Sequence, residues 1–174
     1  MGLMLDESIE LNISIAALKT KNRFVVKKCG IPFYDKKSAV EYAKQMIKEL
    51  DIRCTGYTQP VRSLSGGNQQ KVCIARALTL EPDILFVSEP TRGIDIGAKK
   101  MILDSLLKLN KEKGVTVIIT SSELAELRSV CNRIAIVTEG KIAGILRSNE
   151  DDYKFGLRMS GSKIEDAKEE AKEA

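Results

Sequence analysis

The chain of 174 residues contains no histidine, and its four cysteines are scattered without a C-x-x-C pair. A zinc site would need all four thiolates in one place, so the sequence argues against zinc and favours reduced thiols. No run approaches the ~18 apolar residues that a membrane span requires, and no signal peptide is visible. These absences predict a cytosolic chain that reaches a membrane only through a partner.

The composition is that of a globular domain, with 43% hydrophobic and 30% charged residues and a net charge of +4. Positive charge gathers near the N-terminal end, and the basic residues there are Lys19, Lys21, Arg23, Lys27, Lys28, Lys36 and Lys37. A nucleic-acid-binding protein would carry such a patch, but no recognised reader motif accompanies it. We therefore expect no nucleic-acid partner, and a basic loop that is either solvated or faces acidic lipid headgroups.

Ser65, Gly66 and Gly67 stand immediately before a segment whose apolar residues suit one face of a helix. A serine and two glycines at this place let backbone amides and the positive end of the helix approach a phosphate closely. The same residues also suit an ordinary serine N-cap with a glycine turn. The short pattern alone leaves both interpretations open.

Longer motifs around these residues resemble one protein family. Residues 64–71 read LSGGNQQK and resemble the signature motif of ATP-binding cassette (ABC) ATPases, in the spelling typical of bacterial sugar and nucleoside importers. Residues 84–95 resemble the Walker B and D-loop segment of the same ATPases. The resemblance covers roughly residues 2–160. It implies an ATP-binding role for Ser65, Gly66, Gly67, Asn68, Gln69 and Asp95.

The resemblance assigns three positions to the metal and to catalysis, and two of them differ from the family's usual residue. Ser88 occupies the Walker B position where the family has a magnesium-binding aspartate, while Glu89 keeps the water-positioning carboxylate. The family's switch histidine falls on Ser122, whose hydroxyl can donate a hydrogen bond to a γ-phosphate but carries no charge. We therefore expect Glu89 and Ser122 as catalytic candidates and Ser88 as the metal position.

The sequence contains no Walker A motif, G-x-x-x-x-G-K-[ST]. In the family this loop precedes the signature motif and cradles the phosphates. The resemblance therefore implies the C-terminal part of a nucleotide-binding domain, in the sugar-importer group the second of two fused domains. ATP and Mg²⁺ would then need a partner or the Walker A portion to bind.

The remaining patterns alternate between strand and helix. Residues 84–87 are a continuous apolar run that suits a strand covered on both faces, and residues 115–120 suit a second buried strand. A helix at 96–113, with Gly114 as its C′ residue, should connect them as parallel neighbours. Further helices are predicted at 9–18, 38–50 (capped by Asp35 or Ser38), 67–80 and 150–159, and another helix should start at 121–123. Residues 134–137 and 142–146 should form a hairpin. Loops are predicted at 19–36 and 56–65, and an exposed helical tail from 161.

These elements predict an α/β fold: a partial P-loop NTPase of the ABC type with a mainly parallel sheet and a helical subdomain, lacking the Walker A portion. The expected parts are a helical signature subdomain at 1–80 forming a separate lobe, a Walker B and D-loop core at 81–160, and a charged tail at 161–174. The hairpin at 133–146 should extend the parallel sheet.

Two functions of different class remain. The chain is either part of an ATP-binding importer subunit for a sugar or related small solute, or a non-catalytic module that completes a partner ATPase site and docks on a permease. Both imply that the chain works with a second nucleotide-binding domain and with permease subunits, and indirectly with a solute-binding protein. Both also place it in the cytoplasm, peripherally on the inner face of the cell membrane. An uncovered sheet edge would also favour self-association.

Overall fold

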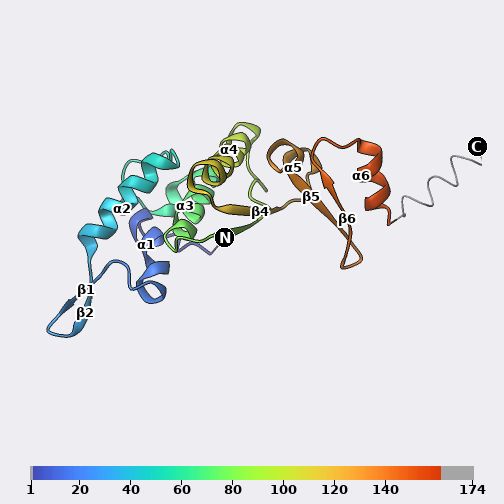
Figure 1. Ribbon diagram of the computed structural model, residues 1–174. Coiled ribbons are helices and arrows are strands. Elements are labelled where there is room, and N and C mark those ends of the chain that lie inside the picture. The colour runs from blue at the N-terminus through green and yellow to red at the C-terminus, as the bar shows by residue number, and fades with distance from the viewer. Residues whose placement is uncertain (1, 162–174) are drawn as a thin grey trace, which may run out of the picture. The chain divides into compact units, whose positions relative to one another are not determined.

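The computed structural model describes residues 2–161, and the charged tail expected beyond residue 161 lies outside the described part (Figure 1). The described residues form two compact units that divide between Thr120 and Ser121, and each is described by itself. The elements of the first unit are α1 (Ile9–Thr20), β1 (Val25–Lys28), β2 (Ile31–Tyr34), α2 (Lys36–Glu49), a 3-10 turn (Val61–Ser63), α3 (Gly66–Leu78), β3 (Ile84–Ser88), α4 (Ile96–Lys113) and β4 (Thr116–Thr120). The second unit contains α5 (Leu124–Val130), β5 (Arg133–Thr138), β6 (Lys141–Arg147) and α6 (Asp152–Met159).

Helix boundaries follow local capping chemistry. The carboxylate of Asp35 accepts the Ser38 backbone amide at the start of α2, and the carboxylate of Asp95 accepts the Ala98 amide at 3.0 Å at the start of α4. Helix α4 ends at Gly114, which adopts the left-handed conformation (φ 68°) that favours glycine. These three boundaries confirm the sequence predictions.

Strands β3 and β4 pair in parallel, with Ile84 opposite Thr116 and Ser88 opposite Thr120. Helix α4 connects them, as predicted. The predicted burial of β3 on both faces is wrong, because Leu85 and Val87 are buried while Ile84 and Phe86 are 53% and 73% exposed. The predicted burial of β4 is also wrong, because its residues alternate between exposed and half-buried. Within residues 2–161 this sheet has only these two strands, and apolar packing covers one of its faces.

The larger of the two apolar clusters in the first unit runs through most of its elements. It joins Ile9 and Ile13 of α1, Met46 of α2, Val72 of α3 and Ile102 of α4, together with the buried side of β3. The boundary expected at residue 80, between a helical signature subdomain and the Walker B core, stays a prediction. Residues on both sides of it contribute to this core. Among the helices that the structure describes, none combines the length and apolar character that crossing a membrane requires.

Two elements differ from the sequence predictions. The predicted basic loop at 19–36 is wrong over residues 25–34, which form the antiparallel β1–β2 hairpin around the turn Cys29-Gly30. Both turn residues have positive φ (50° and 79°), as two-residue hairpin turns of type I′ require. Proline at position 32 is tolerated because a two-stranded hairpin has only edge strands.

The second hairpin, β5–β6, has the predicted turn at Glu139-Gly140, but it forms a two-stranded sheet of its own. The prediction that it extends the β3–β4 sheet is therefore wrong for the described residues. The physical reason is local: Ile134 and Ile136 bury one face of the hairpin against Phe155 of α6, so this unit has an apolar core of its own.

Candidate functional site

The predicted signature residues lie at the N-terminus of α3. Ser65 has extended backbone angles (φ −62°, ψ 156°) and occupies the N-cap position, but its side chain makes no capping hydrogen bond. The first intrahelical bond is from the Gln69 amide to the Ser65 carbonyl at 2.9 Å. Within residues 2–161 the backbone amides of Gly66, Gly67 and Asn68 have no acceptor. This end of the helix therefore presents free N–H donors and the positive end of its dipole.

Asn68 fixes the Ser65 hydroxyl. Its side-chain oxygen Oδ1 accepts the Arg53 backbone amide at 2.9 Å, and its Nδ2 donates to Ser65 Oγ at 2.9 Å. Because a backbone amide can only donate, Oδ1 must face Arg53 and Nδ2 must face Ser65. Ser65 Oγ is therefore an acceptor in this pair. Its own proton is left to donate to another group.

Lys71 ties the same helix to the preceding loop. The residue is 3% exposed, and Nζ donates to the Asp51 carbonyl at 2.6 Å. Burial lowers the pKa of the Lys71 amine, and the Asp51 carboxylate, 3.9 Å away, opposes that shift. Lys71 and Asn68 together hold loop residues 51–53 beside the first turns of α3.

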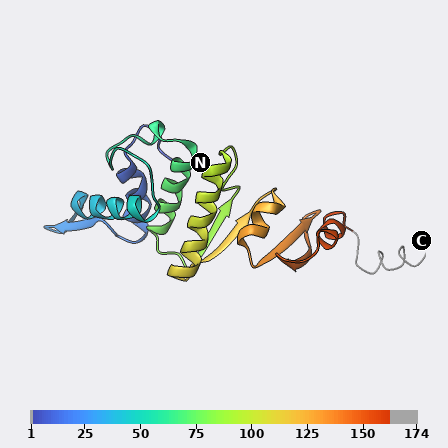
Figure 2. The same cartoon turned by 90° about the horizontal axis from the view of Figure 1, so that it is seen from above.

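An open cavity of about 350 Å³ lies beside this helix end. It is lined from α3 by Ser65, Gly67 and Asn68, and from the start of α4 by Asp95 and Gly97. The two helices lie side by side in Figure 2, and a Cβ on Gly67 would stand only 3.1 Å from the Ala98 Cβ. Glycine at position 67 therefore permits the close approach of α3 and α4. Arg53 and Lys71 also line the cavity.

Two of the residues predicted to bind ATP form side-chain hydrogen bonds to nearby backbone groups. Gln69 does not line the cavity, and its Nε2 donates to the carbonyls of Leu64 at 3.1 Å and Val61 at 3.3 Å. Asp95 does line the cavity, but its carboxylate caps α4 through the Ala98 amide. Their roles toward a nucleotide stay predictions.

The predicted Walker B residues lie at the end of β3. Thr120 Oγ1 donates to Ser88 Oγ at 3.0 Å, and the Glu89 backbone amide donates to the Thr120 carbonyl at 2.8 Å. Glu89 has a positive φ of 45°, a conformation that costs a non-glycine residue of order 1 kcal/mol and concentrates at functional turns. Neither Ser88 nor Glu89 lines the cavity beside the N-terminus of α3.

Magnesium prefers carboxylate and other oxygen ligands, often with several retained waters. At position 88 the structure offers a neutral hydroxyl that is already bonded to Thr120, so this position fits the ion poorly. Among residues 2–161 there is no group of three or more His, Cys, Asp or Glu side chains arranged to hold a metal.

Ser122 belongs to the second unit, where it is exposed in the segment between β4 and α5. Its neighbour Ser121 accepts the Glu123 amide at 3.0 Å, and α5 starts at Leu124. The catalytic role of Ser122 stays a prediction.

The structure adds two residues that the sequence interpretation did not single out. Lys71 could have been noticed as the last residue of the LSGGNQQK string. Arg53 had no signal, because it reaches the site through its backbone amide, 15 positions before Asn68.

The fold and this helix terminus define the class of protein. The family model described as ABC transporter matches residues 4–92, and the chain belongs to that family. The chain shares the cassette fold with a dimeric ATP-binding cassette in a post-hydrolysis state, bound to ADP and Pi, at 25% identity and a TM-score of 0.67. That match covers 86% of this chain and 60% of the cassette. The α/β fold predicted as a partial cassette is thereby confirmed.

Sugar-import subunits are among the proteins similar to this chain. The chain is 43% identical over 159 residues to a ribose import ATP-binding protein of Lactococcus lactis, and 38% identical over 159 residues to a galactose/methyl galactoside import ATP-binding protein of Treponema pallidum. Each match covers 91% of this chain, but only 31% and 30% of the relatives. The chain thus spans about a third of the length of these relatives.

Proposed function

We propose that this chain is the part of an ABC importer's ATP-binding subunit that carries the signature motif and the Walker B and D-loop segment. It would serve ATP-driven uptake of a sugar or related small solute. The kinship to ribose and galactose import proteins supports the class of solute. The importer would place the chain at the inner face of the cell membrane, bound to permease subunits and a second nucleotide-binding domain.

The observation that carries the proposal is the state of the α3 N-terminus. Ser65 Oγ receives a hydrogen bond from Asn68 and keeps its proton for an outside acceptor, while the first-turn amides have no acceptor in the described part of the chain. Donors arranged in this way suit a phosphate, and they act by electrostatic stabilisation of charge on a transferring phosphoryl group.

This role is separable from the chemistry at β3. The signature residues need no metal ligand or general base, whereas Glu89 would position water beside a metal position occupied by Ser88. With no Walker A motif in these 174 residues, the γ-phosphate facing Ser65 would be held by a partner domain. We infer that the chain assists hydrolysis at a partner's nucleotide and contributes little at its own Walker B position.

The test compares two substitutions in a transporter reconstituted from this chain and its partner subunits. Ser65→Arg should abolish most ATP turnover, because bulk and charge would occupy the phosphate position. Glu89→Gln should cost much less. Equal losses from the two substitutions would contradict the asymmetry and restore Ser88 and Glu89 as a working site.

The alternative function, a non-catalytic module that docks on a permease and completes a partner ATPase, is motivated by Ser88 and by the missing Walker A motif. Calorimetric titration of the isolated chain with Mg-ATP distinguishes the two. Micromolar binding by the chain alone would exclude the non-catalytic module. Absence of binding, together with a Glu89→Gln transporter that turns over ATP as fast as the wild type, would favour it.

A further inference from the structure

The β1–β2 hairpin has two chemically different faces. Val26 pairs with Phe33 and Lys28 with Ile31, and residues directly opposite each other in a ladder project to the same side. This set, Val26, Lys28, Ile31 and Phe33, is called the outer face below. The alternate residues, which include Tyr34, project to the other side.

The other side fastens the hairpin to the helices. The Tyr34 hydroxyl lies 2.9 Å from Ser14 Oγ and also donates to the Glu10 carboxylate, both on α1. At the base of the hairpin, the Asp35 amide donates to the Phe24 carbonyl at 2.8 Å, and the Phe24 side chain is buried. The hairpin is therefore held at its base and projects beyond α1 and α2 (Figure 1).

The outer face is apolar and uncovered. Val26, Ile31 and Phe33 are 39%, 58% and 48% exposed. An isolated two-stranded hairpin is at best marginally stable in water, and an apolar face of this kind gains stability when a partner covers it.

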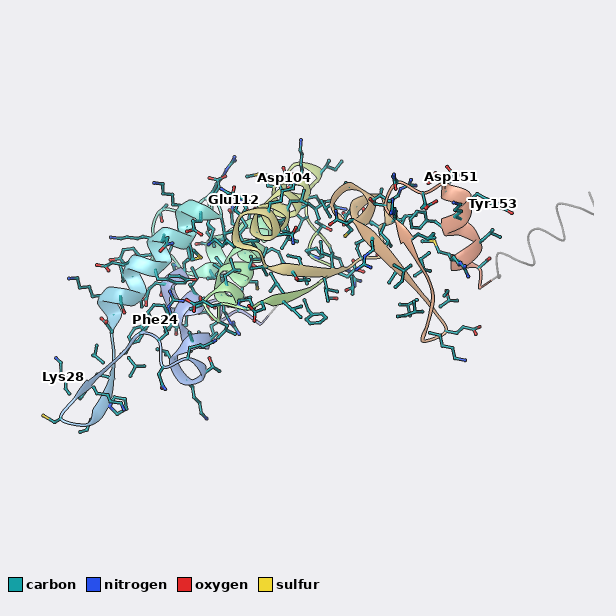
Figure 3. All side chains as sticks on the ribbon, viewed as in Figure 1. Phe24, Lys28, Asp104, Glu112, Asp151 and Tyr153 are labelled. Atoms are coloured by element: carbon teal, nitrogen blue, oxygen red, sulfur yellow. The ribbon has the colours of Figure 1, made fainter. Side chains whose placement is uncertain are left out.

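The side chains around the outer face are mostly basic, which favours a partner of negative charge. Residues 19–37 contain seven basic side chains and one acid. Asp35 caps α2, and Arg23 pairs with Glu81 at 2.9 Å. Within the described part of the chain, no ion pair neutralises the remaining basic side chains, which are Lys19, Lys21, Lys27, Lys28, Lys36 and Lys37. Figure 3 shows Lys28 at the tip of the hairpin and Phe24 at its base.

We propose that the outer face is a binding site for an anionic lipid surface. The apolar side chains would enter the headgroup boundary, and the lysines would pair with lipid phosphates. The lysines lie before, within and after the hairpin, so positive charge surrounds the apolar residues. That distribution complements a surface of uniform negative charge better than it complements one carboxylate cluster on a protein. The site is independent of ATP and of the signature residues.

The test uses sedimentation with vesicles of phosphatidylcholine, alone or mixed with phosphatidylglycerol. The chain should bind the anionic vesicles, and the binding should weaken as salt rises. Lys27→Gln with Lys28→Gln should lower the partition coefficient roughly 5- to 25-fold, since each lysine near an anionic surface contributes about fivefold and Lys27 projects to the other side of the hairpin. Phe33→Ser should lower it roughly tenfold through lost apolar burial. A polarity-sensitive fluorophore on Cys29, the exposed cysteine at the turn, should report transfer to an apolar medium.

The matched control is Lys111→Gln with Lys141→Gln, which removes the same charge from exposed positions outside the β1–β2 hairpin. It should bind nearly as the wild type does. Equal weakening by the two lysine pairs would mean general attraction of a basic protein and would overturn the proposal. So would a lack of binding to anionic vesicles, or binding of soluble polyglutamate alone that depends on Phe33 and Lys28, which would assign the face to an acidic protein. Circular dichroism confirms that each variant is folded.

Discussion

The side-chain amide of Asn68 donates to the hydroxyl oxygen of Ser65 at 2.9 Å, and the Arg53 backbone amide fixes the direction of that bond. Which of the two side chains donates this hydrogen bond matters more than the contact itself. A serine that accepts at Oγ keeps its proton for an incoming anion, whereas a serine that donates to its neighbour has none to offer.

The first prediction tests this polarity with an isosteric change. In Asn68→Asp, both carboxylate oxygens accept, so the Ser65 proton turns inward and a negative charge faces the phosphate position. ATP turnover in the assembled transporter should fall roughly 10²-fold, the loss typical of one oxyanion donor. Asn68→Ala leaves the hydroxyl free to rotate and should cost less, roughly tenfold. Turnover that is lower in Asn68→Ala than in Asn68→Asp would show that Asn68 only supports the loop at Arg53.

The second prediction compares two adjacent glycines in the first turn of α3. A Cβ on Gly67 would stand 3.1 Å from the Ala98 Cβ, while a Cβ on Gly66 would meet nothing within 4 Å. Gly67→Ala should therefore lower the free energy of unfolding by about 1–3 kcal/mol through overpacking of α3 against α4. Gly66→Ala, the matched control, should be neutral or stabilising by up to about 1 kcal/mol because alanine has the higher helix propensity. Urea denaturation measures both, and equal effects would contradict the close helix contact.

The third prediction concerns alkaline stability. Burial, followed by the hydrogen bond to Glu10, raises the pKa of the Tyr34 hydroxyl to about 12. The folded chain holds this proton more tightly than the unfolded chain, whose tyrosines titrate near pH 10. The stabilisation is complete below pH 10 and is lost as the pH rises from about 10 to 12. Because Tyr34 is 38% exposed, solvent screening should limit the effect to about 1 kcal/mol.

The measurement is the difference in unfolding free energy between the wild type and Tyr34→Phe, at pH 9 and at pH 11.5. The difference should favour the wild type at pH 9 and shrink at pH 11.5. Tyr153→Phe is the control, since Tyr153 is 65% exposed and makes no side-chain hydrogen bond in the described chain. A difference independent of pH would mean that the Tyr34 hydroxyl does not anchor the hairpin.

Local chemistry made much of this fold predictable. Asp35, Asp95 and Gly114 mark helix ends through interactions within four residues, and the apolar runs at 84–87 and 115–120 are of strand length. Such signals depend on the nearby sequence alone, so they could be read without a structure. The same holds for Ser65 as the residue before a helix.

What escaped prediction depends on residues far apart. The apolar run at 84–87 does not reveal which face is covered, because that depends on α4 and on strands elsewhere. The β1–β2 hairpin lacks regular alternation, and its turn places Cys29 at a φ that a cysteine seldom adopts. The bond from the Arg53 amide to Asn68 crosses 15 positions and leaves no trace in either residue type.

The last prediction concerns assembly through the uncovered face of the β3–β4 sheet. Phe86 stands opposite Ile118 in the register, and with Ile84 these residues form an apolar face that is 73%, 41% and 53% exposed. Within the described residues each strand of this sheet also has one unpaired edge. Exposed apolar faces and open edges promote association, so the chain should form dimers or larger species as its concentration rises.

Phe86→Lys should shift this equilibrium toward the monomer, because it places a charge at the centre of the face. The folded state should change by only about 0.5 kcal/mol, since Phe86 is mostly exposed. The matched control is Ile96→Lys, at a position that is 86% exposed but lies at the start of α4 rather than on the sheet. Light scattering over a concentration series should show association of the control and a monomeric Phe86→Lys chain. A wild-type chain that stays monomeric at high concentration, or association unaffected by Phe86→Lys, would show that this face does not drive assembly.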